Sequence, residues 1–142
     1  MGIHVRAAAA VVVLSTVALS GCTSVGAAYA VLDREAGARD EVPADLPGYA
    51  WDDVDQATAR FVGEDEGTSL WLARARDDAS ACLLAYADEE SWVLGCGGGG
   101  ALFSVGGMTG TFTVVPDGAP APEGMTRISE NVYTASGGSS HS

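Results

Sequence analysis

The chain has 142 residues, a length typical of one domain, and its 47% hydrophobic and 18% charged residues are those of a globular protein. Nineteen acidic residues stand against seven basic ones, all of them arginine, and the formal charge of −12 repels nucleic acids and anionic headgroups. We therefore expect no nucleic-acid partner. Because the sequence contains no lysine, a Walker A loop and a Schiff-base lysine are both excluded.

The two histidines lie at the extreme ends of the chain, at His4 and His141. A catalytic triad or a zinc site that needs an imidazole inside the domain therefore has no residue to build it. We expect neither a metal nor a cofactor, and no catalytic residue can be assigned.

Residues 1–21 are predicted to be a signal peptide. Arg6 precedes an uncharged apolar run over residues 7–19, which is the layout of a secretory signal. The run ends in Leu19-Ser20-Gly21-Cys22, which resembles the lipobox of bacterial lipoproteins. This resemblance implies that Cys22 receives a lipid and becomes the first residue of the mature protein.

Two alternatives for the N-terminus remain open. Residues 7–32 carry no charge and are long enough to cross a hydrocarbon core of ~30 Å as one uncleaved helix. Ala28-Tyr29-Ala30 matches the A-x-A site of an ordinary signal peptidase, whose cleavage would release the domain. All three predictions place the remainder of the chain outside the cell, and the first two hold it at the outer face of the cytoplasmic membrane.

Behind the signal, the chain divides into a linker, a domain and a tail. Residues 22–47 are predicted to be an acidic linker after the lipidated cysteine, since residues 33–47 mix charges with prolines and show no apolar period. Residues 48–135 are predicted to form one small β domain, and residues 136–142 a flexible polar tail. A domain of this size benefits from a covalent staple.

The predicted fold class is all-β or β-rich, a small antiparallel meander sheet with one short N-terminal helix. Asp52 is a candidate helix cap, which predicts a short helix over residues 53–58. From Ala59 onward, short β-prone runs alternate with turn residues, which predicts six or seven strands. These expected strands cover residues 59–63, 68–75, 81–87, 91–96, 101–105, 111–115 and a last segment near 127–134.

Cys82 and Cys96 lie symmetrically about Glu89, in the middle of an acidic turn. A hairpin folded at Glu89 pairs the two cysteines directly and places them on one face with their apolar neighbours. In an oxidising compartment the two thiols are expected to form a disulfide.

Residues 95–100 formally satisfy the GxGxxG pattern of dinucleotide-binding loops. No amphipathic helix follows and no βαβ unit is present, so we interpret the glycine run as a flexible or bulged connection between strands.

The acidic clusters are interpreted as solvated turns, although a hydrolase could in principle use a pair of them. The three tryptophans are expected in the core or half-buried in a sheet, with a glycan- or peptide-binding platform as the alternative. Arg74 and Arg76 share a strand face and are expected to pair with acids across the sheet. The acids concerned are Asp52, Asp53, Asp55, Glu64, Asp65, Glu66, Asp77, Asp78, Asp88, Glu89 and Glu90, and the tryptophans are Trp51, Trp71 and Trp92.

Several loose motifs together resemble small, uncharacterised, membrane-anchored extracytoplasmic proteins of high-GC Gram-positive bacteria. Besides the apolar N-terminus, they are Asp45-Leu46-Pro47, Arg60, Trp71-Leu72-Ala73-Arg74, Cys82-Leu83, Cys96 and Val115-Pro116-Asp117-Gly118. The resemblance spans most of the chain and implies location and architecture, but it assigns no functional residue.

The predicted function is accordingly a non-enzymatic binding or structural module at the cell surface, anchored to the membrane and meeting a protein or glycan partner there. A small hydrolase that uses carboxylates alone, or a regulatory or sensor subunit of a membrane partner, are the alternatives. An enzyme would need two convergent carboxylates shielded from water, whereas a binding module needs none.

Overall fold

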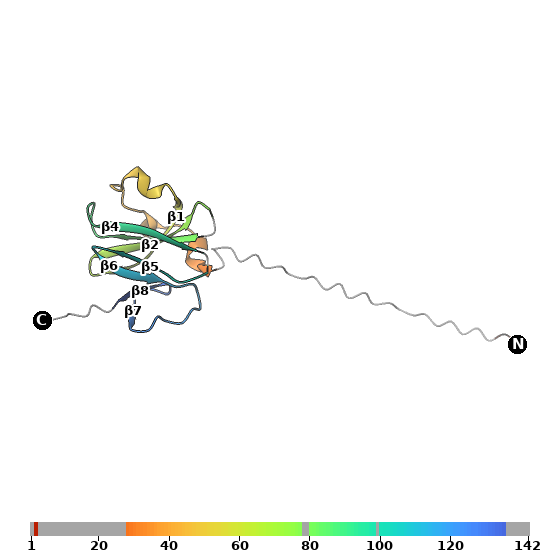
Figure 1. Cartoon of the computed structure of the whole chain (residues 1–142). Helices are drawn as coiled ribbons and strands as arrows, with labels where there is room; N and C mark the ends of the chain where they lie inside the picture. Colours follow the sequence, from red (N-terminus) through yellow and green to blue (C-terminus); the bar gives the residue numbers. More distant parts are fainter. Residues whose placement is uncertain (1, 3–27, 78–79, 99, 136–142) are drawn as a thin grey trace.

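The computed structural model describes residues 2, 28–77, 80–98 and 100–135. Its chain forms two antiparallel four-stranded sheets stacked face to face (Figure 1). The signal peptide, Cys22 and the tail at residues 136–142 lie outside the described residues. No helix in the described part of the chain is long and apolar enough to cross a membrane.

The first sheet is a meander with the order β1-β2-β3-β4. Its strands are β1 (Val54–Asp65), β2 (Thr68–Ala75), β3 (Ser80–Tyr86) and β4 (Trp92–Gly98). The second sheet has the order β5-β6-β8-β7, so the expected single meander is replaced by two sheets. Its strands are β5 (Phe103–Gly107), β6 (Gly110–Val114), β7 (Met125–Arg127) and β8 (Val132–Ala135).

The β-rich class is confirmed, but the helix expected over residues 53–58 is wrong. The described chain holds only three single-turn 3₁₀ helices: η1 (Ala30–Asp33), η2 (Ala38–Asp40) and η3 (Gly48–Trp51). Asp52 ends η3 instead of starting a helix, and Val54 already pairs with Ala75 in the sheet. Val54 is 1% exposed, so burial and strand pairing prevail over the local capping signal.

The hairpin register predicted from the two cysteines is confirmed. Cys82 pairs with Cys96 across β3 and β4, and Tyr86 pairs with Trp92 at the other end of the ladder. The sulfur atoms are 2.07 Å apart and form the expected disulfide. The turn closes through the backbone N–H of Ala87, which donates to the carbonyl of Ser91 at 2.9 Å.

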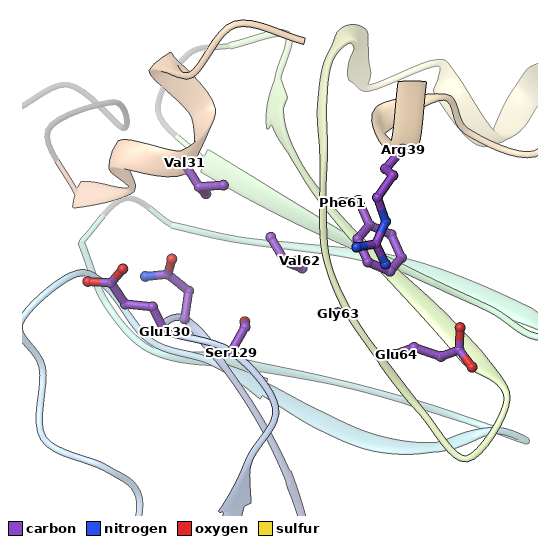
Figure 2. Close-up of a pocket in the computed structure, with 9 residues that line it drawn as sticks. Val31, Arg39, Phe61, Val62, Gly63, Glu64, Ser129 and Glu130 are labelled. Atoms are coloured by element: carbon purple, nitrogen blue, oxygen red, sulfur yellow. The ribbon is translucent and has the colours of Figure 1, made fainter. Parts of the chain in front are cut away.

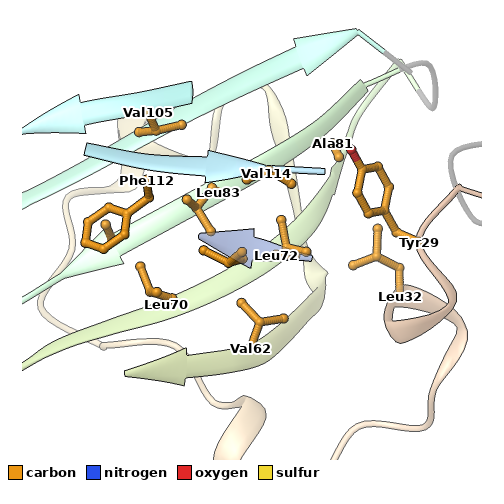
Figure 3. Packing of buried hydrophobic residues seen from close by; sticks show 12 residues of the cluster. Tyr29, Leu32, Val62, Leu70, Leu72, Ala81, Leu83, Val105, Phe112 and Val114 are labelled. Atoms are coloured by element: carbon orange, nitrogen blue, oxygen red, sulfur yellow. The ribbon is translucent and has the colours of Figure 1, made fainter. Parts of the chain in front are cut away.

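The main core lies between the two sheets (Figure 3). Leu70, Leu72 and Leu83 of the first sheet pack there against Phe112 and Val114 of the second. Alternate residues of the same strands face the other side of the first sheet, as the two-residue period of a strand requires. The first sheet is therefore apolar on both faces and needs a cover on each.

The outer face of the first sheet is covered by the segment expected to be a linker. Leu46 and Trp51 are both 9% exposed and pack with Trp71, Ala73 and Leu84. Residues 33–47 thus belong to the domain, in contrast to the extended acidic linker expected from their composition. Their charges did not prevent burial because the one buried acid, Asp40, is fully paired.

Asp40 fastens this segment to the edge of the first sheet. Its carboxylate accepts two hydrogen bonds from the Arg34 guanidinium at 2.8 and 2.7 Å, and one from the backbone N–H of Gly37 at 2.7 Å. The N–H of Phe61, on the free edge of β1, donates to it at 2.8 Å. The Arg34 hydrogen bond above all, with the two backbone donors, holds the pKa of Asp40 well below its ordinary value.

The described domain begins well before residue 48. Tyr29 is 0% exposed and lies with Leu32 in the core between the sheets (Figure 3). Asp117 holds this segment on both sides of Tyr29: its N–H donates to the Ala28 carbonyl at 2.8 Å, and its carboxylate accepts from the Ala30 N–H at 2.7 Å. Residues 28–32 therefore belong to the folded domain and not to a membrane span, which shortens the alternative span to residues 7–27.

Two glycines of β4 give the glycine run a structural role. A Cβ at Gly97 would lie 2.3 Å from Cγ of Phe103, and one at Gly95 would lie 3.0 Å from Val105. Both glycines sit inside the strand, so they let β5 approach β4 and close one side of the sandwich. Gly97 and Gly98 are thus strand residues, in contrast to the flexible or bulged connection expected.

Replacing Gly97 by alanine should destabilise the domain. The added methyl group would overlap the Cβ and Cγ atoms of Phe103, which lie next to the Phe103 backbone. Overpacking of this kind costs about 1–3 kcal/mol. Gly98→Ala is the matched control, because a Cβ there meets nothing within 4 Å. Urea unfolding followed by tryptophan fluorescence should separate the two variants, and equal midpoints would contradict close packing of β5 on β4.

Replacing Asp40 by asparagine should lower the free energy of unfolding by about 2–3 kcal/mol at neutral pH, since hydrogen bonds to a charged group are lost. The native pKa of Asp40 lies below its unfolded value, so this stabilisation is complete above about pH 4 and is lost as the pH falls further. The difference in the free energy of unfolding between the wild type and the variant should therefore also shrink as the pH falls below about 4. Glu41→Gln removes the same charge from an exposed neighbour and is the control; a difference that does not depend on pH would refute the assignment.

Candidate ligand-binding pocket

A pocket of about 400 Å³ opens at the side of the sandwich where β1 faces the turn between β7 and β8 (Figure 2). We call it the mouth pocket. Four separate segments of the chain meet there: η1 with Val31, η2 with Arg39, β1 with residues 61–64, and the turn with residues 129–131. Its volume is in the range of small-molecule sites.

Gly63 brings β1 and the second sheet together beside this pocket. Its φ of +144° belongs to a backbone region that side chains disfavour, and a Cβ there would lie 2.7 Å from Cγ2 of Ile128. The pairing of β1 with β2 shifts between Phe61 and Gly63, as at a β-bulge. Phe61 and Val62 lie on opposite faces of the sheet, as successive strand residues do, and both line the pocket.

Three apolar side chains, Val31, Phe61 and Val62, form the apolar floor of the mouth pocket. Val62 is 8% exposed and belongs to the core between the sheets, and Val31 packs beside that core. On the other side, Phe61 lies under Arg39, whose Cζ is 4.5 Å from the ring centroid (Figure 2). Such stacking keeps a guanidinium in place while leaving its N–H groups available.

Arg39 differs from the other arginines that the structure describes. Its guanidinium makes no hydrogen bond or ion pair within the described part of the chain, whereas each of the others donates to a carboxylate or a carbonyl. These are Arg34 to Asp40, Arg60 to the Arg34 carbonyl, Arg74 to Asp33, Arg76 to the Trp51 carbonyl, and Arg127 to the Ser129 carbonyl. Of the acid pairs expected across the sheet, Arg74 has one, with Asp33 of η1, and Arg76 instead binds a backbone carbonyl.

Ser129 contributes a second polar group without a partner. Its Oγ is shielded from solvent and has no hydrogen-bond partner among the described residues. A buried hydroxyl left unpaired costs about 1–3 kcal/mol, so such groups commonly face water or a ligand. Asn131, which also lines the pocket, is by contrast fixed: its Nδ2 donates to the Val115 carbonyl at 3.0 Å and to Asp117 at 2.8 Å.

The tryptophans occupy a different part of the molecule. Trp51 and Trp71 are buried in the cluster on the outer face of the first sheet. Trp92 is half-buried beside the exposed ring of Tyr49, with the ring centroids 6.3 Å apart. These two rings border a cleft of about 420 Å³ together with Asp53. Nearby, the Tyr86 hydroxyl donates to Asp45 at 2.7 Å, and this bond raises the pKa of Tyr86 to about 12.

The acids singled out in the sequence do not converge on a metal. No group of three or more His, Cys, Asp or Glu side chains within the described ranges is placed to hold an ion. Asp55, Asp77 and Asp88 accept hydrogen bonds from backbone N–H groups two or three residues further on, as turn acids do. Asp78 lies outside the described residues.

Comparison of the chain with protein-family models, curated proteins and solved structures finds no match. The chemistry of the mouth pocket must therefore be inferred from its own residues. Sequence reasoning missed Arg39 and Ser129, because each looked like an ordinary residue of a linker or a turn. Only the fold shows that one lacks a charged partner and the other a hydrogen-bond partner.

Proposed function

We propose that this protein is a membrane-anchored, extracytoplasmic binding module without enzymatic activity, and that it holds a small ligand with an anionic group in the mouth pocket. The observation that carries the proposal is a free guanidinium and an unpaired hydroxyl, Arg39 and Ser129, beside one apolar floor. Arginine binds carboxylates through paired N–H groups, and the floor accepts an apolar body.

The anchor is the second part of the proposal. The apolar run and the lipobox-like Leu19-Ser20-Gly21-Cys22 support a lipid on Cys22. Cleavage after Ala30 would remove Tyr29, a fully buried core residue, together with the Ala28 carbonyl and the Ala30 N–H that bond Asp117. The fold therefore favours processing upstream of residue 28 over release by an ordinary signal peptidase.

Substituting Cys22 by alanine should abolish incorporation of labelled palmitate in a lipoprotein-processing bacterium, because the thiol is the acylated group. Ser24→Ala, two residues away, should retain the label. Mass spectrometry of the wild-type protein should find Cys22 as its first residue, with Tyr29 present. A wild-type protein that stays in the membrane without label would replace the lipid anchor by the span at residues 7–27.

The binding proposal predicts opposite effects of Ser129→Ala on stability and on affinity. N-acetyl-leucine, which combines a carboxylate, an amide and an apolar side chain, should shift the amide signals of Val31, Val62 and Asn131 in NMR titrations. Arg39→Gln should weaken binding at least fivefold, which is about 1 kcal/mol, whereas Arg76→Gln should not. Ser129→Ala should also weaken binding but raise the free energy of unfolding, because it removes a buried hydroxyl that has no hydrogen-bond partner in the folded protein.

Ser104→Ala is the matched stability control, since the Ser104 hydroxyl is bonded to Thr113 Oγ1 at 2.8 Å. This variant should lose about 1 kcal/mol of stability and keep its affinity. If N-acetyl-leucine perturbs none of the pocket residues at millimolar concentration, the binding proposal fails.

A further inference from the structure

Charges of both signs surround the mouth pocket. Arg39 and Glu130 lie on opposite sides of Val62, and Glu64 adds a second carboxylate on the Arg39 side (Figure 2). Both glutamates are exposed, and neither forms a salt bridge within the described part of the chain. One cation and two anions leave the rim negative, so a ligand that is only anionic gains at Arg39 and is repelled by the glutamates. A ligand that also carries a positive group is complementary to the whole rim.

The positions of Arg39 and Glu130 define how far apart the two charges of the ligand should be. Arg39 stacks on Phe61 at the outer face of the first sheet, whereas Glu130 belongs to the turn of the second sheet. Facing sheets are spaced ~10 Å apart, and Arg39 lies beyond the outer face of the first sheet, so the two groups are separated by at least roughly that distance. A free amino acid carries its charges on adjacent atoms and cannot reach both. An extended peptide advances ~3.3–3.6 Å per residue, so about three residues are needed to span the gap.

The centre of the pocket also matches a peptide. Ser129 lies between Arg39 and Glu130 in Figure 2, with its buried hydroxyl unpaired. A peptide bond brings an N–H and a carbonyl to this position, and either can bond a hydroxyl. Val31 and Val62 provide apolar surface for the side chains. An apolar spacer between two charges would leave Ser129 without a partner.

We propose that the mouth pocket binds a short peptide of about three residues, with free termini and apolar side chains. Its carboxylate binds Arg39, its ammonium group binds Glu130, and a backbone amide bonds Ser129. This inference rests on the proposed function and names the class of ligand for the same site.

The test compares the tripeptide Leu-Ala-Leu with its N-acetylated form on the full-length protein, by NMR titration of the same amide signals. Free Leu-Ala-Leu should bind at least fivefold more tightly than the acetylated peptide. Glu130→Gln should bring that ratio close to one, while Glu123→Gln, which removes an exposed acid before β7, should leave it unchanged. Ser129→Ala should weaken both peptides by a similar factor.

The possible results distinguish failure of the peptide assignment from failure of the anion-binding pocket. Suppose that the acetylated peptide and N-acetyl-leucine bind through Arg39. If the free amine then gives no gain in affinity, or if that gain persists in Glu130→Gln, the peptide assignment is overturned. The anion-binding pocket stands in that case. If hexapeptides with the same ends bind as tightly as the tripeptide, the predicted length is wrong and the assignment falls. If none of these probes binds, both proposals fail.

Discussion

Burial of the first sheet on both faces is the constraint on which the rest of the structure depends. β2 and β3 carry buried apolar side chains on both faces, so neither face can be left to water. The second sheet covers one face, and residues 41–53 cover the other. Because the second cover has no regular strand or long helix to hold it, a single buried carboxylate, Asp40, fastens it to the edge of β1. The arrangement also accounts for a stable core in a chain with so many acids, since most of them remain on turns.

The mouth pocket follows from the same constraint. Strands β4 and β5 close one side of the sandwich through glycines that permit close contact, whereas β1 and the β7–β8 turn meet mainly at Gly63 and Ile128. The N-terminal segment passes over this side and supplies Val31 and Arg39. A cover needed for stability thus brings a cation and an apolar side chain to the one place where the sheets are less tightly joined.

The sequence was informative where structure is periodic or local. Alternation and turn residues located most strands, and the symmetry of Cys82 and Cys96 about Glu89 determined a whole hairpin register. It failed where residues far apart in the chain decide the outcome. Asp40 looked like a solvated linker acid because its partner Phe61 lies 21 positions away. Single 3₁₀ turns show no apolar period, so Leu46 and Trp51 gave no sign of covering a sheet. The pocket combines four segments, and no spacing in the sequence relates Arg39 to Ser129.

The two hydrogen bonds of Asp117 to Ala28 and Ala30 limit how far the domain can lie from Cys22. The described fold begins at Ala28, and residues 23–27 lie between it and Cys22 in the sequence; a fully extended chain of that length reaches about 20 Å. With a lipid on Cys22, as proposed above, the domain would stay within a few Debye lengths of the headgroups. Its excess of carboxylates would then be repelled by an anionic leaflet at close range. The orientation that it adopts is expected to turn its few arginines toward the lipid and its acidic turns away, so electrostatics and tether length together would fix which face of the sandwich meets the outside.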